Sequence, residues 1–372
     1  MQMLLTRCAG LLMLILSVTA DAQISATGPK TSTLPVAQAG DYLLHNFQFA
    51  SGEALPELRL HYTTFGTPQR DAAGHVINAV LILHGTGGDG QQFLRPQFSE
   101  VLLAPGGLLD AARYYIVLPD NIGHGHSSKP SDGLHAHFPQ YAYGDMVEAQ
   151  YRLLTEGLHI NHLRLILGTS MGCMHAFMWG ESHAGFADAL MPLACLPVQI
   201  AGRNRIWRKM IIDAIKNDPA WLGGEYRTPP LGGLRTAADL LMIAGSAPAL
   251  WQAQFPDRDA ADRRLSDYLD GQLRELDAND LLYQVAASRD YDPAAKLASI
   301  HVPVMWVNSA DDFINPPELG IAEREAHKLP RGKFVLLPVS ERTHGHGTHT
   351  WAALWQDYLR ELLAESSAPA AQ

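Results

Sequence analysis

The stretch LRLILGTSMG at residues 163–172 decides the fold of this chain. Its first five residues are mostly apolar, as in a buried parallel strand, and an apolar helix is predicted from Met171 to Trp179. Between them stands the pattern Gly168-x-Ser170-x-Gly172. A turn this tight requires small residues two places before and after the serine, and it raises the serine hydroxyl above the sheet. The stretch therefore predicts a nucleophilic Ser170.

Strand and helix patterns alternate on both sides of this stretch. Further strands are predicted at 58–65, 78–84, 114–120, 187–194, 302–308 and 333–337, and further helices at 144–157, 203–216, 236–244, 260–276, 280–288 and 350–363. Such alternation indicates an α/β fold with a doubly wound, mostly parallel sheet. The patterns from 197 to 296 are only helical, so we expect a helical cap there, over the carboxyl ends of the strands. The core is then split into segments 41–196 and 297–364.

Composition excludes several classes of protein. The chain has 372 residues, of which 47% are hydrophobic, which is too many for a disordered or fibrous protein. Its 28 Lys and Arg against 38 Asp and Glu give a net charge of −10, so no nucleic-acid partner is expected. Repeated apolar stretches long enough to cross a bilayer are absent from the sequence.

The first 22 residues have the organisation of a secretory signal peptide. Arg7 supplies a positive charge, Ala9 to Val18 form a short apolar run, and Ala20-Asp21-Ala22 fits the cleavage pattern. The sequence therefore predicts a bacterial protein that is periplasmic or secreted, with no stable membrane insertion after cleavage; an uncleaved anchor is the alternative. Residues 23–40 are predicted to be a flexible leader, and residues 365–372 a disordered tail.

Cys173 and Cys195 are the two cysteines beyond the signal peptide. An oxidising compartment permits a disulfide, but two cysteines form no framework of the kind that small secreted proteins use. Both lie in apolar surroundings, so they are expected to be two small buried hydrophobic residues.

A serine nucleophile needs a base, and the base needs an acid to orient it. In α/β folds with this turn the chain order is Ser, acid, His. Asp311 and Asp312 follow a late strand, and the residues alone leave the choice between them open. The loop after the last strand carries three histidines, of which His346, between two glycines, is the predicted base. His344 and His349 are then structural or hydrogen-bonding residues.

The oxyanion that forms on the substrate needs two hydrogen-bond donors. One is expected to be the Met171 N–H, and the other the Thr86 N–H, in a loop where Gly85 permits close approach of the backbone to substrate. A phosphate site at this loop is disfavoured because no Lys-Ser/Thr follows it.

Histidine spacing also permits a zinc hydrolase. The patterns His344-x-His346-x-x-His349 and His124-x-His126 are spaced as metal ligands often are, and the chain has 17 histidines. This hypothesis leaves the serine turn, the late aspartates and the glycine loop unexplained. We therefore predict neither a metal nor another cofactor.

Longer motifs resemble the homoserine O-acetyltransferase type of α/β-hydrolase. The resemblance extends over residues 45–363 and includes APGGLLDAARYYIVLPDNIG (104–123), FPQYAYGDMVEAQYRLL (138–154), GTSMGCMHAFMWGE (168–181), DAIKNDPAWLGGEY (213–226) and DANDLLY (277–283). It implies that Asp312 is the acid, because SADDFINPPE (309–318) contains the family's Asp-x-x-x-Pro-Pro, and it places the family's Gly-His pair at Gly345-His346. Proteins of this fold family often form homodimers, so both a monomer and a homodimer are compatible with the resemblance.

Two departures from this family bear on the substrate. Gly347 stands where the family usually has an aspartate that helps to hold the substrate amine, and Ile212 and Asp213 stand where an arginine is often found. These departures and the signal peptide argue against homoserine. The sequence thus predicts an exported serine hydrolase that cleaves a carboxylic ester of a small molecule.

An O-acyltransferase is the alternative, and a metal-dependent hydrolase ranks third. Predicted substrate contacts are Gly85, Arg205, Trp207 and Tyr283.

Overall fold

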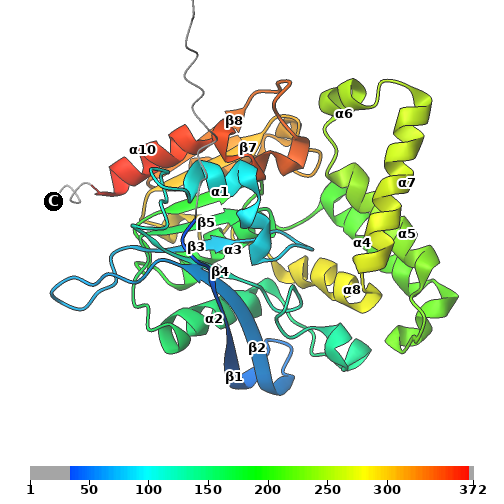
Figure 1. The fold of residues 1–372 in the computed structure, drawn as a ribbon, viewed down its shortest axis with the longest axis horizontal. Helices are drawn as coiled ribbons and strands as arrows, with labels where there is room; N and C mark the ends of the chain where they lie inside the picture. The colour runs from blue at the N-terminus through cyan, green and yellow to red at the C-terminus, as the bar shows by residue number, and fades with distance from the viewer. Residues whose placement is uncertain (1–33, 368–372) are drawn as a thin grey trace, which may run out of the picture. The chain divides into compact units, whose positions relative to one another are not determined.

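An eight-stranded sheet forms the centre of the fold (Figure 1). The structure is a computed structural model and describes residues 34–367. The strands are β1 (Gln38–Gln48), β2 (Ala54–Phe65), β3 (Ala79–Leu83), β4 (Tyr115–Pro119), β5 (Leu165–Thr169), β6 (Leu190–Leu193), β7 (Val304–Ser309) and β8 (Gly332–Leu337). They lie in the order β1-β2-β4-β3-β5-β6-β7-β8. β1 and β2 are antiparallel to their neighbours, whereas β3 to β8 run parallel, as expected.

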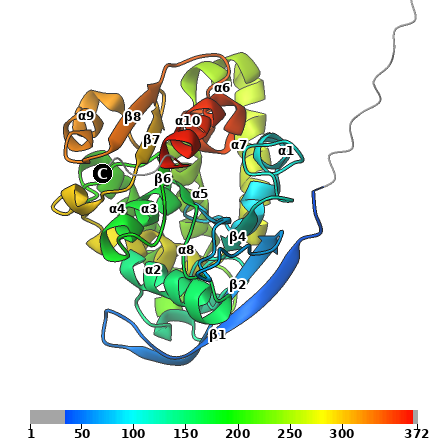
Figure 2. The same ribbon diagram turned by 90° about the vertical axis from the view of Figure 1, so that its left-hand side faces the viewer.

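Helices cover both faces of the sheet, and this explains why its central strands are continuous apolar runs. Leu81 and Leu83 of β3 pack on the same side as α2 (Tyr143–Arg152) and α3 (Met171–Ser182). Val80 and Ile82, which alternate with them, pack with α1 (Pro96–Leu102) and α10 (Gln356–Ser367). Figures 1 and 2 show α2 and α10 on opposite sides of the sheet.

Between β6 and β7 the chain forms five α-helices at the right of Figure 1. They are α4 (Gly202–Lys216), α5 (Leu231–Ala244), α6 (Pro248–Gln254), α7 (Arg258–Glu275) and α8 (Ala278–Ala286). We call residues 197–296 the cap. A short helix, α9 (Ile321–Ala326), follows β7.

The ends of the chain differ from the sequence predictions. Residues 38–40, predicted in the leader, belong to β1, which pairs along its length with β2. The closing helix begins at Gln356 rather than at 350, because two short 3-10 helices, Gly345–Thr350 and Ala352–Leu354, come first. That helix runs to Ser367, so residues 365–367 are helical rather than part of a tail.

The predicted signal peptide (1–22), most of the leader and residues 368–372 lie outside the described residues. Among residues 34–367, no helix combines the length and apolar character needed to cross a bilayer.

Candidate active site

Ser170 occupies a strained turn at the carboxyl end of β5 (Leu165–Thr169). Its φ of 54° and ψ of −110° lie where a residue with a side chain is rarely found. A methyl group on Gly168 would overlap the Gly172 carbonyl oxygen, and one on Gly172 would overlap the Leu83 carbonyl oxygen. The two glycines are therefore required by space, as the pattern predicted, and α3 begins directly after the serine.

Three side chains from separate parts of the chain meet at this turn. The Ser170 hydroxyl lies 2.8 Å from Nε2 of His346, and Nδ1 of the same ring lies 2.8 Å from Oδ2 of Asp312. Asp312 follows β7, and His346 lies in the loop after β8. The structure therefore brings together the three residues that the sequence predicted as nucleophile, base and acid.

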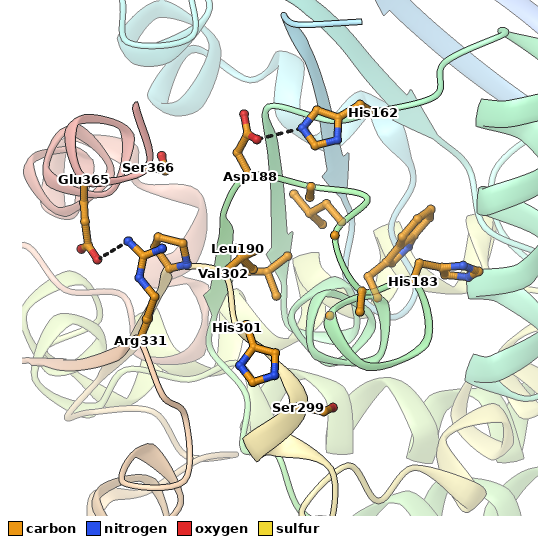
Figure 3. Close-up of a pocket in the computed structure, with 17 residues that line it drawn as sticks. His162, His183, Asp188, Leu190, Ser299, His301, Val302, Arg331, Glu365 and Ser366 are labelled. Atoms are coloured by element: carbon orange, nitrogen blue, oxygen red, sulfur yellow. Dashed lines mark hydrogen bonds and ion pairs between the residues drawn. The ribbon is translucent and has the colours of Figure 1, made fainter. Parts of the chain in front are cut away.

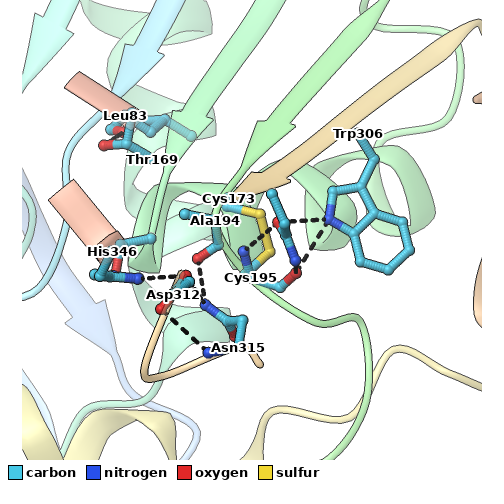
Figure 4. Close-up of a disulfide and its surroundings, with 11 residues drawn as sticks. Leu83, Thr169, Cys173, Ala194, Cys195, Trp306, Asp312, Asn315 and His346 are labelled. Carbon is cyan, nitrogen blue, oxygen red and sulfur yellow. Dashed lines mark hydrogen bonds and ion pairs between the residues drawn. A yellow bond between two sulfur atoms is a disulfide. The ribbon is translucent and has the colours of Figure 1, made fainter. Parts of the chain in front are cut away.

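The Asp312 carboxylate is held in its ionised form. Burial alone raises its pKa, but the neighbouring His346 ring and hydrogen bonds from Asn315 and the Ile314 N–H outweigh this and leave the pKa below its usual value. Oδ1 accepts the Ile314 N–H at 2.7 Å, and Oδ2 accepts the Asn315 amide at 2.9 Å. Figure 4 shows Asn315 between this carboxylate and the end of β6.

Asp311 has a different role from Asp312. It accepts hydrogen bonds from the Ser309 hydroxyl and, at 3.1 Å, from the Gly345 N–H. It thus anchors the backbone immediately before His346 rather than its imidazole ring. The choice of Asp312, which the residues alone left open, agrees with this geometry.

The other histidines of this loop do not converge on a metal-ligand arrangement. His344 stacks on Trp351 with ring centroids 3.9 Å apart. His349 is enclosed, and burial lowers its pKa to about 3. Within residues 34–367, no group of three or more His, Cys, Asp or Glu side chains is arranged to bind a metal ion.

The predicted oxyanion donors flank the serine. Met171 is the first residue of α3, so its N–H has no acceptor within the helix. On the opposite side, a methyl group on Gly85 would lie 3.2 Å from Cβ of Ser170, which shows how closely this loop approaches the nucleophile. The Thr86 N–H follows in the same loop, and among the described residues it has no hydrogen-bond acceptor.

Three of the residues that were predicted to contact the substrate make contacts with other parts of the protein. The Tyr283 hydroxyl, expected to meet substrate, lies 2.7 Å from the carbonyl oxygen of Phe138, to which it donates, and 3.0 Å from that of Ala136. Trp207 is buried on α4 beside the Arg208 guanidinium. Arg205 lines a cavity of about 550 Å³ that Ser170, Asp312 and His346 do not line.

A larger cavity, missed by sequence reasoning, adjoins the acid. It has a volume of about 790 Å³ and lies between the first turn of α4 and the loop after β7. Met174, one turn beyond the serine, and the side chains of Phe313 and Ile314 give it apolar walls, and Arg203 lies over the Phe313 ring at 4.0 Å. Sequence reasoning did not group these residues, because they come from distant segments of the core and the cap.

A third cavity, of about 610 Å³, lies at the wrong end of the strands for catalysis (Figure 3). It is bordered by Leu190, the first residue of β6, and by Val302, just before β7. Ligands of parallel sheets bind beyond the carboxyl ends of the strands, which is where Ser170 lies. The His162–Asp188 hydrogen bond and the Arg331–Glu365 ion pair at this cavity are accordingly structural contacts.

Cys173 and Cys195 form a disulfide, contrary to the expectation that they are two free hydrophobic residues. Cys173 lies in the first turn of α3, and Cys195 follows β6, which is the strand next to β5. The chain therefore brings their Cα atoms to 5.9 Å, within the usual range for a disulfide. Spacing along the sequence could not reveal this neighbourhood.

The disulfide also adjoins the acid of the site (Figure 4). The carbonyl of Ala194, next to Cys195, accepts a hydrogen bond at 3.0 Å from the Asn315 amide that also binds Asp312. The nucleophile helix and the acid loop are thus attached to the same end of β6.

Known proteins similar to this chain share this architecture. The sequence profile described as alpha/beta hydrolase fold matches residues 78–352. The homoserine O-acetyltransferase of Moorella thermoacetica is 29% identical over 365 residues, covering 86% of this chain and 94% of its own length. A probable acyltransferase of Methanothermobacter thermautotrophicus is 28% identical over 299 residues, covering 80% of this chain and 90% of its own length.

A solved structure gives the same fold. An acetylester hydrolase from Corynebacterium glutamicum superposes with a TM-score of 0.77 at 21% identity, covering 89% of this chain and 96% of the other. The chain belongs to the α/β-hydrolase fold family, and within it is similar to the homoserine O-acetyltransferases.

Proposed function

We propose that this enzyme is an exported serine esterase that cleaves a carboxylic ester through an acyl-enzyme on Ser170. The observation that carries the proposal is the unbroken series of contacts from the serine hydroxyl through both nitrogens of His346 to Asp312, at 2.8 Å each. Family membership supports esterase or acyl-transfer chemistry of this kind.

The reaction has two halves, each with one proton moved by His346. The Ser170 hydroxyl attacks the acyl carbon while Nε2 takes its proton, and Asp312 stabilises the imidazolium that forms. Backbone N–H groups of Met171 and Thr86 stabilise the negative oxygen. The alcohol leaves with the proton from Nε2. Water then attacks the acyl-enzyme, gives its proton to Nε2, and releases the acid as the proton returns to Ser170.

Export rests on the sequence pattern at residues 1–22, with separate support from the cysteines. Disulfides persist in the periplasm and outside the cell, and are rare in the bacterial cytoplasm. The buried disulfide between Cys173 and Cys195 is therefore consistent with an exported enzyme. Fractionation of the native cells, with an antibody to the mature chain, should find it outside the cytoplasm, and a cytoplasmic location would contradict export.

The esterase assignment is tested with a fluorophosphonate probe and p-nitrophenyl esters of graded chain length. The wild-type protein should react at Ser170 and hydrolyse at least one ester, and Ser170→Ala should do neither. Ser182→Ala, at the exposed end of the same helix, is the matched control and should behave as wild type. Failure to label the wild type, or equal labelling of Ser170→Ala, would reject the proposal.

Acyl transfer to an alcohol is the second candidate, favoured by the similarity to homoserine O-acetyltransferases over most of the chain. The same acyl-enzyme would be resolved by an alcohol instead of water. Against homoserine stands Gly347, which offers no carboxylate for a substrate amine beside His346. The ratio of ester to acid formed when alcohols are added separates the candidates, since a hydrolase gives mainly acid at low alcohol concentration, whereas an acyltransferase gives mainly ester.

A further inference from the structure

A buried histidine holds the peptide that carries one proposed oxyanion donor. His84 follows β3 and is fully buried. Its Nδ1 lies 2.9 Å from the carbonyl oxygen of Gly85, and its Nε2 lies 3.0 Å from both the backbone and the side-chain nitrogen of Asn121. A carbonyl oxygen only accepts, so Nδ1 bears the proton and Nε2 accepts from Asn121. Burial lowers the pKa of His84, which keeps the ring neutral.

Side chains from two helices, α2 and α3, fix this tautomer of His84. The Asn121 amide oxygen accepts from the Gln150 side chain of α2. The Gln150 oxygen in turn accepts the indole N–H of Trp179, on α3, at 2.7 Å. Because an indole only donates, the Gln150 amide has one orientation, and the Asn121 amide therefore also has one. The series from Trp179 to His84 thus ends with a donor aimed at Gly85.

Because a peptide group is rigid, the hydrogen bond from His84 to the Gly85 carbonyl also sets the direction of the Thr86 N–H. The Gly85 carbonyl also accepts the Gly88 N–H at 3.1 Å, so two donors fix it. The peptide between Gly85 and Thr86 is planar and trans, hence the Thr86 N–H points opposite to that carbonyl. Holding the carbonyl oxygen on one side of the peptide therefore fixes the Thr86 N–H on the other side, in the loop that approaches Ser170 at Gly85.

We propose that His84, held by Asn121 and Gln150, is a positioning residue that aims the Thr86 N–H at the oxyanion. The proposal rests on the proposed function, since it needs an oxyanion at Ser170. His84 touches no reacting atom and transfers no proton. Without its donor, the Gly85–Thr86 peptide keeps only the bond from Gly88 and is free to rotate, and a fraction of molecules then lacks one oxyanion donor.

A pair of amide substitutions tests the donor itself. The Asn side-chain nitrogen reaches the position of Nδ1, whereas that of Gln reaches Nε2. His84→Asn therefore keeps a donor for Gly85, and His84→Gln loses it. We expect kcat per labelled serine to fall by about 10- to 100-fold in His84→Gln, with KM little changed, and to be largely retained in His84→Asn. His124→Gln is the matched control, because His124 is equally buried but its Nδ1 donates to Ile122.

A second readout separates positioning from a general loss of structure. A trifluoromethyl ketone forms a tetrahedral adduct whose oxygen occupies the oxyanion site, so its affinity should fall in His84→Gln by the same factor as kcat/KM. Binding of the product alcohol should not change. If His84→Gln does not fold, Asn121→Leu, which removes one of two donors to Nε2, should show a several-fold loss in both quantities.

The proposal is overturned if His84→Gln keeps wild-type kcat per labelled serine, or if His124→Gln loses as much. It is also overturned if Asn121→Leu, used in place of an unfolded His84→Gln, retains both kcat and ketone affinity. A wild-type protein that neither labels nor hydrolyses esters would instead reject the esterase assignment, so the two failures are distinguishable.

Discussion

Removal of the Cys173–Cys195 disulfide is expected to destabilise the protein by about 3 kcal/mol. The two cysteines are 22 residues apart in sequence, and opening a loop of that length restores conformational entropy to the unfolded chain. The folded state should change little, because Cys195 remains held from its other side: its carbonyl accepts hydrogen bonds from Trp306 and Asn308, each at 3.0 Å. Loss of the disulfide should therefore lower the free energy of unfolding and leave kcat of the folded enzyme nearly unchanged.

Urea unfolding followed by tryptophan fluorescence measures this loss. The double variant Cys173→Ala/Cys195→Ala and the wild type in dithiothreitol should both unfold at lower urea than the oxidised wild type. Dithiothreitol should have no effect on the double variant, which controls for the reagent. Identical midpoints for the oxidised wild type and the double variant would refute the reasoning from loop length.

Three further predictions follow from the site and the core. Asp312→Asn should lower kcat about 10⁴-fold, because a neutral amide neither fixes the tautomer of His346 nor stabilises its charged form, whereas Asp311→Asn should cost far less; equal losses would contradict the assignment. Gly172→Ala should yield little folded protein by circular dichroism, since its methyl group overlaps the Leu83 carbonyl; a normal yield would contradict the packing. Burial lowers the pKa of His175 and of His349 to about 3, so the unfolded state binds more protons below pH 6.5, and stability falls as pH decreases. Urea unfolding should therefore give a free energy of unfolding that is lower at pH 5 than at pH 8, by about 2 kcal/mol for each of the two histidines.

The parts of the fold that follow from local pattern were predictable from sequence. The continuous apolar runs that became β3, β4 and β5 are buried on both faces, and the glycines around Ser170 are required by overlap with backbone atoms. The loops that carry the acid and the base followed from their order after late strands, whereas the choice of Asp312 over Asp311 came from the family resemblance. β1 was missed because its exposed and buried residues alternate imperfectly, and its pairing with β2 is a long-range contact.

What sequence reasoning missed depends on contacts between distant segments. The disulfide arises because β5 and β6 are neighbours in the sheet, which the spacing of Cys173 and Cys195 does not encode. Tyr283 was expected at substrate because it lies in the cap, but the loop at residues 136–138 engages its hydroxyl. Asn121 and Gln150 lie in segments that resemble the family, but the resemblance gave neither residue a role, so their link to His84 emerges only from the packed structure.

The central claim is that Ser170 carries the acyl group during turnover, and trapping that intermediate tests it most directly. The enzyme is mixed with a chromogenic ester that it hydrolyses, quenched with acid within milliseconds, digested and measured by mass spectrometry. The account predicts that the peptide containing Ser170 gains the mass of the acyl group, in step with a burst of released alcohol, and that Ser170→Ala shows neither. Turnover without an adduct, or an adduct on another residue, would contradict it.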